Sequence, residues 1–309
     1  MSDDLKSLKE FDFDSANVHL WVFKTGVDAN NKQLPRYTGR WVETGQYLDD
    51  GLSEVAQTVV EDVTEITPYN ILAQNNEGSA LTIPFEETHV GLIVDACYEQ
   101  DDKRRIDKVK HLTNAVFYVA KFVRNGGVVY GIKRTPPEWK NVKRRNVISV
   151  NFRDEELEVE EADTFSIQKT FDVLVCGSTV FALHKNNCES ILNYKQAHLD
   201  NFDQLNQDSD FVDLFDDVEP IKKYVGRDKI QLRRAAAIQE KGYYRNSDFI
   251  KSLIANKDRL KLNISVDGNN RIVVTEDACR DIFQALLDHR LISHFQENVY
   301  DVQHTVDVP

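Results

Sequence analysis

The chain has 309 residues, of which 41% are apolar and 10% aromatic, so it can bury a real core and is not disordered as a whole. Its 38 Lys and Arg against 51 Asp and Glu give a net charge of −13, which argues against a protein that coats nucleic acid with its whole surface. A local basic patch remains possible, because salt screens exposed charges over roughly 8–10 Å. The longest apolar runs, such as NAVFYVAKFV, stop well short of the roughly 20 residues of a membrane-spanning helix.

The opening MSDDLKSLKE lacks the apolar core of a secretory leader, so we expect a cytoplasmic protein that reaches a membrane only through a partner. The cysteines are scattered without any CxxC pair, which predicts neither a disulfide framework nor a four-thiolate zinc site. We expect all of them to be reduced and mostly buried. They are Cys97, Cys176, Cys188 and Cys279.

The first half of the chain is typical of strands with one long helix. NVHLWVFKT at 17–25 is rich in β-branched and aromatic residues and predicts a strand. The segment 50–66 places apolar residues at helical spacing and predicts an amphipathic helix. YNILAQ at 69–74 predicts a further short strand.

Two hairpins are expected next. The runs 114–123 and 127–135 flank Asn125-Gly126, a pair that adopts positive φ at little cost and favours a tight turn. VISVNF at 147–152 predicts another strand, and a second hairpin is expected around Gly177-Ser178.

After residue 185 the pattern becomes helical. A helix is expected from 186, capped by Asn186 or Asn187, and others near 208–217, 228–240, 246–256 and 276–288. One small hairpin at Asp267-Gly268 interrupts them. The prediction is an α+β fold with a strand-rich domain at 1–185 and a mostly helical domain at 186–309. No Pro/Gly-rich hinge separates the two, so we expect them to pack firmly.

Charge is segregated along the chain. Residues 133–145 hold six basic residues and one Glu, whereas 154–163 hold seven acids and no base. Residues 200–219 carry eight acids and no base, and 222–234 carry six bases against one Asp. Such blocks can pair with each other within the chain or between subunits.

The stretch EQDDKRRIDKVKH, 99–111, concentrates five Lys and Arg within eight positions. The spacing of Ile106, Val109 and Leu112 predicts a short anchored helix, with Arg104 and Lys108 on another of its faces. One interpretation is a solvated face whose charges are neutralised by neighbouring aspartates. The other is a phosphate-binding surface, which needs positive donors within reach but no special spacing.

No catalytic constellation is found. Glu138-Trp139-Lys140 matches the letters of a nuclease motif but follows two prolines, which cannot lie in a central strand. His184 with Cys188 lacks a Gly-rich oxyanion loop, and His289 with His294 lacks a ligand pattern. Neither a Walker pattern nor GxGxxG occurs. We therefore expect no enzyme, no cofactor and no metal.

Two segments carry a resemblance to a known family. TFDVLVCGSTVFALHKNNCESILNYK, 170–195, is a strand hairpin that leads into a helix, and DIFQALLDHRLISHFQENVYDVQ, 281–303, is a Leu-rich helix followed by a strand with Tyr300. Together they resemble the KwaB-like family of the Kiwa anti-phage defence system, over about 15–305.

The resemblance implies an antiviral effector that binds duplex DNA without known catalytic chemistry. It further implies dimers within a larger complex at the inner membrane, beside the membrane protein KwaA. The phosphate-binding interpretation of 99–111 gains weight from it. The candidate DNA-binding residues are Lys103, Arg104, Arg105, Lys108, Lys110, Lys143, Arg144 and Arg145.

Three alternatives stay open. The cations Lys222, Lys223, Arg233 and Arg234 could face either DNA or an acidic partner. The protein could instead be an adaptor whose charge blocks only pair subunits. It could also be a metal-dependent nuclease whose site the sequence does not reveal.

Overall fold

The computed structural model describes residues 3–28, 35–140, 150–153, 156–159, 165–193 and 201–302. It divides into two units, the first made of 1–69 and 75–193, the second of 70–74 and 194–309. The strand-rich half carries an eight-stranded sheet and helices dominate the other half, so the predicted α+β fold is confirmed.

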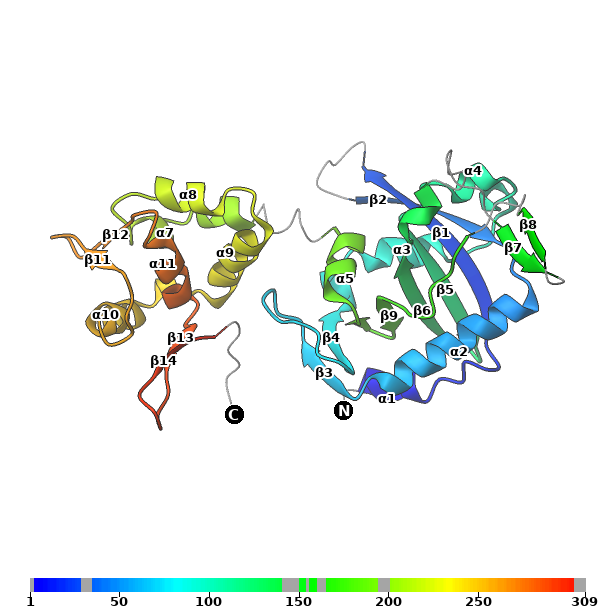
Figure 1. The fold of residues 1–309 in the computed structure, drawn as a ribbon, viewed down its shortest axis with the longest axis horizontal. Coiled ribbons are helices and arrows are strands. Elements are labelled where there is room, and N and C mark those ends of the chain that lie inside the picture. Colours follow the sequence, from blue (N-terminus) through cyan, green and yellow to red (C-terminus); the bar gives the residue numbers. More distant parts are fainter. Residues whose placement is uncertain are drawn as a thin grey trace. The chain divides into compact units, whose positions relative to one another are not determined.

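The sheet of the first unit has the order β2-β1-β5-β6-β9-β10-β4-β3, with β2 at one edge (Figure 1). All neighbours are antiparallel except β3 and β4. Its strands are β1 (Asn17–Val27), β2 (Pro35–Val42), β3 (Glu65–Pro68), β4 (Ser79–Pro84), β5 (Phe117–Arg124), β6 (Gly127–Arg134), β9 (Val173–Cys176) and β10 (Thr179–Ala182).

Both predicted hairpins of this half are confirmed. Asn125 and Gly126 have φ of 48° and 82°, the positive values that a two-residue turn between twisted strands requires. β5 and β6 pair along their whole length, from Phe117↔Arg134 to Arg124↔Gly127. β9 and β10 pair around Gly177-Ser178 in the same manner.

The long helix α2 (Gln46–Asp62) runs across one face of the sheet (Figure 1). It buries Leu52, Ala56 and Val60 in the same apolar cluster as Tyr118 and Phe122 of β5. The other elements of this unit are α1 (Asp3–Lys9), η1 (Phe85–Glu87), α3 (Val90–Ala96), η2 (Asp102–Arg104), α4 (Val109–Leu112), η3 (Pro137–Lys140), α5 (Lys185–Ile191) and the β7–β8 hairpin (Val150–Arg153, Glu156–Val159).

Several boundaries differ from the predictions. The strand predicted at 69–74 is wrong, because the Asn70 side chain accepts from Leu72 N and bends this segment into a turn. The helix predicted from 186 begins at Lys185, with His184 as its N-cap, and ends at Ile191. Of the strand predicted at 147–152, residues 147–149 lie outside the described residues.

The second unit packs short helices around Phe211, Ile238 and Phe283, which are fully buried. Asp208 and Asp228 begin α7 and α9 by accepting hydrogen bonds from backbone N–H groups, as N-caps do. Its elements are α7 (Ser209–Val212), α8 (Glu219–Val225), α9 (Lys229–Lys241), η4 (Tyr243–Arg245), α10 (Ser247–Asn256), β11 (Ser265–Val266), β12 (Ile272–Val273), α11 (Cys279–Leu286), β13 (Arg290–Ile292) and β14 (Val299–Asp301). The hairpin at Asp267-Gly268 is confirmed, whereas α7 is much shorter than the predicted 208–217.

Candidate nucleic-acid interface

The single helix predicted around 104–112 is wrong. Asp101 caps the short turn η2 by accepting from Lys103 N (2.9 Å), and Arg105 then returns to extended backbone. Ile106 N donates to Trp41 O (2.8 Å), so the chain here runs along the edge of β2. Only the single turn α4 is helical. The charged side chains are therefore placed by contacts with the sheet edge and share no helix face.

Two of the five basic side chains hold this segment in place. The Arg104 guanidinium donates to the carbonyl oxygens of Ala96 and Glu99 and lies 5.1 Å from the Trp21 ring centre. Arg105 forms an ion pair with Glu43 and lies 5.5 Å from the ring centre of Trp41. Cation–π contacts of this kind stabilise a folded segment.

The other three, Lys103, Lys108 and Lys110, are exposed. Lys108 lies 3.9 Å from Asp107 with both side chains about 60% exposed, a geometry in which ion pairs are weak. Among the described residues, the ammonium groups of Lys103 and Lys110 have no carboxylate partner. Lys103 and Lys110 can therefore meet phosphates without breaking an ion pair, and Lys108 would give up only a weak one.

The edge strand adds cations that sequence reasoning missed. The pairs Lys24↔Thr38, Gly26↔Arg36 and Val22↔Arg40 place the side chains of Lys24, Arg36 and Arg40 on one face, because directly opposite residues share a face. The alternation in PRYTGRWV was the signal that could have found the two arginines.

Two hydrogen bonds join this face to the lysine segment. Lys24 Nζ donates to Lys110 O (3.1 Å), and Arg40 donates to Lys103 O (3.4 Å). We call the six cations that these contacts bring together the basic surface. They are Lys24, Arg36, Arg40, Lys103, Lys108 and Lys110.

The pKa of the His111 imidazole reflects its burial and the charges around it. Desolvation chiefly lowers its pKa below the usual 6.5, and the positive charges of Arg40, Lys110 and Lys108 lower the pKa further. Asp107, 3.2 Å from its Nδ1, opposes them without reversing the shift. The imidazole is therefore neutral near pH 7 and sits in a net positive environment.

The remaining candidate cations differ in their surroundings. Lys143, Arg144 and Arg145 lie outside the described residues. On α8, Lys222 bonds Glu219 and Lys223 bonds Glu276, so these two cations already meet acids within their own unit. This favours charge pairing over DNA contact for the second unit's basic block.

The residues weighed for catalysis have structural contacts. Trp139 of the Glu138-Trp139-Lys140 motif lies in a 3₁₀ turn, is buried, and donates to Ser166 O. His184 caps α5 by accepting from Asn187 N. All four cysteines are buried and free, as predicted. Within the described residues, no group of three or more His, Cys, Asp or Glu could hold a metal ion.

A buried ion pair lies at the end of the sheet. Lys133 Nζ donates to Asp172 Oδ1 (2.8 Å), with side-chain exposures of 8% and 1%. Asp172 also accepts from Asn187 Nδ2 (3.0 Å) and, through Oδ2, from Arg134 N (2.8 Å). The carboxylate is fully bonded and joins β6 to α5.

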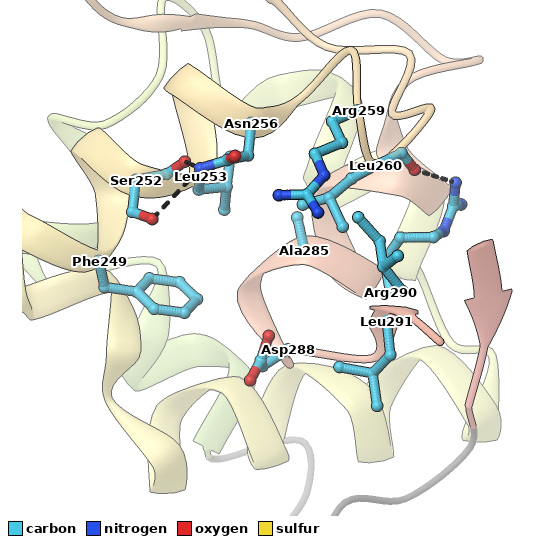
Figure 2. Close-up of a pocket in the computed structure, with 11 residues that line it drawn as sticks. Phe249, Ser252, Leu253, Asn256, Arg259, Leu260, Ala285, Asp288, Arg290 and Leu291 are labelled. Atoms are coloured by element: carbon cyan, nitrogen blue, oxygen red, sulfur yellow. Dashed lines mark hydrogen bonds between the residues drawn. The ribbon is translucent and has the colours of Figure 1, made fainter. Parts of the chain in front are cut away.

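The second unit has a cavity of about 320 Å³ lined by α10, α11 and β13 (Figure 2). Its wall includes Phe249, Leu253 and Leu291, while Arg259 and Asp288 enter it from different sides. Of the two cations in its lining, Arg259 and Arg290, the second is already paired with Asp281, so the cavity offers no row of free positive charge for a sugar–phosphate backbone. The basic surface therefore remains the better nucleic-acid candidate.

In the part of the chain that the structure describes, no helix is long and apolar enough to cross a membrane. A comparison with family models matches residues 112–295, more than half of the chain, to the family described as Kiwa protein KwaB-like. No curated protein and no solved structure matches the chain. The matched residues begin just after the lysines of the basic surface. The chain belongs to the KwaB-like family of components of the Kiwa anti-phage defence system.

Proposed function

We propose that this chain binds duplex DNA, largely independently of sequence, through the basic surface and as part of an anti-phage defence complex. The observation that carries the proposal is the convergence of six cations from three separate segments, in a chain of net charge −13. Among the described residues, only Lys108 has a carboxylate nearby, while Lys24 and Arg40 each donate one hydrogen bond to a backbone carbonyl, so the positive charge of this surface is largely unneutralised.

The binding is electrostatic. Lys and Arg displace counterions condensed on the duplex, so affinity falls steeply as salt rises. An edge strand and short turns present these cations, and such contacts position a protein on phosphates without reading bases. The acidic remainder keeps the free protein from covering the chromosome.

The proposal includes the partners that the family resemblance implies. Dimers beside the membrane protein KwaA would hold many copies of the surface together, and effective concentration then multiplies weak contacts. The proposal includes no chemical step. Plasmid DNA incubated with the protein and Mg²⁺ or Mn²⁺ should stay intact, and nicked or linear products would establish the nuclease alternative.

The test is fluorescence anisotropy with labelled duplex DNA. The variant carries Lys103→Glu, Lys108→Glu and Lys110→Glu, and it leaves Arg104 and Arg105 intact because they hold the segment. Loss of about three phosphate contacts should weaken binding at least tenfold at 0.1 M salt.

A matched control carries the same change of charge elsewhere, at the exposed Lys6, Lys9 and Lys251. It should bind within about twofold of the parent, because none of its three lysines belongs to the basic surface. If both variants bind DNA equally more weakly than the parent, the effect comes from net charge, and the basic surface is not the DNA-binding site.

An adaptor without DNA contact is the second candidate. The pairing of Lys222 and Lys223 with acids favours it for the second unit. Absence of DNA binding by the intact protein at 20 mM salt, together with co-purification with KwaA, would establish this alternative.

A further inference from the structure

A pocket with both polar and apolar walls opens at the end of the sheet, between the start of β5 and the end of β6. Its volume is about 430 Å³, within the range of ligand sites. Asn114, Arg134 and Gln168 line it, with Pro136 and Asn187. Nothing in the proposed duplex binding uses it.

The pocket adjoins the basic surface. Asn114 lines the pocket and lies four residues after Lys110 of the basic surface. Phe23, Phe117 and Arg134 form one row across three strands, and Lys24 follows Phe23, so the side chains of Arg134 and Lys24 leave opposite faces of the sheet near the end of β6. Two strand spacings of about 4.8 Å put the Cα atoms of Arg134 and Lys24 about 10 Å apart, which is about three base steps of one strand. The backbone also connects them, since Val116 N donates to Phe23 O (2.8 Å).

The pocket offers unused polar groups. Within the described residues, the Arg134 guanidinium has no carboxylate partner, and the side chains of Asn114 and Gln168 make no hydrogen bond. An amide offers both donor and acceptor atoms, which suits the edge of a base. A guanidinium binds phosphate with two parallel bonds or stacks on a base.

The buried ion pair holds this pocket in shape. Asp172 accepts from Arg134 N and from Asn187 Nδ2, and both of these residues line the pocket. Their positions are thus fixed before any ligand arrives, which lowers the entropic cost of binding.

We propose that this pocket takes one unpaired nucleotide of DNA held on the basic surface, so that the protein prefers duplexes with a single-stranded gap or end. A paired base cannot enter, because its edge and faces are engaged in the duplex. The inference rests on the proposed function and adds a substrate preference to it.

The test compares two labelled DNAs in anisotropy titrations with the full-length protein. One is a continuous duplex closed by hairpins at both ends, and the other is the same duplex with a four-nucleotide gap. The gapped DNA should bind about tenfold more tightly, the effect of one or two added hydrogen bonds.

Two pocket variants, Arg134→Gln and Gln168→Ala, should lose this preference and keep the parent's affinity for the closed duplex. Arg36→Gln, on the basic surface, should weaken the binding of both DNAs equally and leave the ratio of the two affinities unchanged. The inference is overturned, and the proposed function is not, if the parent binds both DNAs with equal affinity or if both pocket variants still prefer the gapped DNA. Absence of binding to either DNA overturns the proposed function and the inference with it.

Discussion

Removal of the Asp172 carboxylate should destabilise the first unit strongly. In Asp172→Ala, the Lys133 ammonium stays buried without its partner, and Arg134 N and Asn187 Nδ2 each lose an acceptor. Breaking one side of a buried, fully bonded ion pair costs about 3–5 kcal/mol. That is a large part of the roughly 5–15 kcal/mol that stabilises a typical domain.

Tryptophan fluorescence during urea unfolding measures this loss. All three tryptophans, Trp21, Trp41 and Trp139, lie in the first unit, so their emission follows that unit alone. Circular dichroism of the helices follows both units. The fluorescence midpoint should fall steeply in Asp172→Ala.

The double variant Lys133→Met with Asp172→Leu separates an unpaired charge from lost packing. The double variant should lose much less stability than the sum of the losses in the two single variants, because no unpaired charge remains buried. As a control in the same unit, Lys6→Ala removes an exposed pair with Glu10 and should cost about 0.5 kcal/mol or less. A loss below about 1 kcal/mol in Asp172→Ala, or additive losses in the double variant, would refute the reasoning.

Three further outcomes are expected. DNA affinity should rise as pH falls from about 7.5 to 5.5, because bound phosphate raises the lowered pKa of His111 and the complex takes up a proton. In anisotropy titrations, His111→Gln should remove this pH dependence. A parent protein whose DNA affinity does not change with pH would contradict the prediction. Gly131→Ala should cost about 1–3 kcal/mol in urea unfolding, since its Cβ would lie 2.7 Å from the Phe171 ring, and an unchanged midpoint would argue against this packing. Arg104→Met should speed proteolysis within 99–111, because the segment loses two hydrogen bonds and its contact with Trp21, whereas an unchanged digestion pattern would speak against an anchoring role.

Features set by neighbouring residues were predictable from the sequence. Asn125-Gly126 specified its turn because positive φ at both positions is a local property. The long helix was found through its apolar spacing, although Gly45 rather than a residue near 50 precedes it. Asp267-Gly268 marked a real hairpin for similar reasons.

The candidate site depended on contacts between distant residues. Ile106, Val109 and Leu112 have helical spacing, but the bond from Ile106 N to Trp41 O, 65 positions away, holds the chain extended at the sheet edge. Arg40 joins the lysines only because β1 and β2 pair in one register. Register between strands and the path of a crossing segment are tertiary features, which local periodicity does not encode.

The salt dependence of duplex affinity tests DNA binding by the basic surface most directly. If all six cations contact phosphates, the slope of log K against log salt should be about −5 for the parent. In the variant with Lys103→Glu, Lys108→Glu and Lys110→Glu, the slope should be about −3 or shallower, because three phosphate contacts are lost. The same slope in both proteins, or no binding by the parent at low salt, would contradict a phosphate-binding role for this surface.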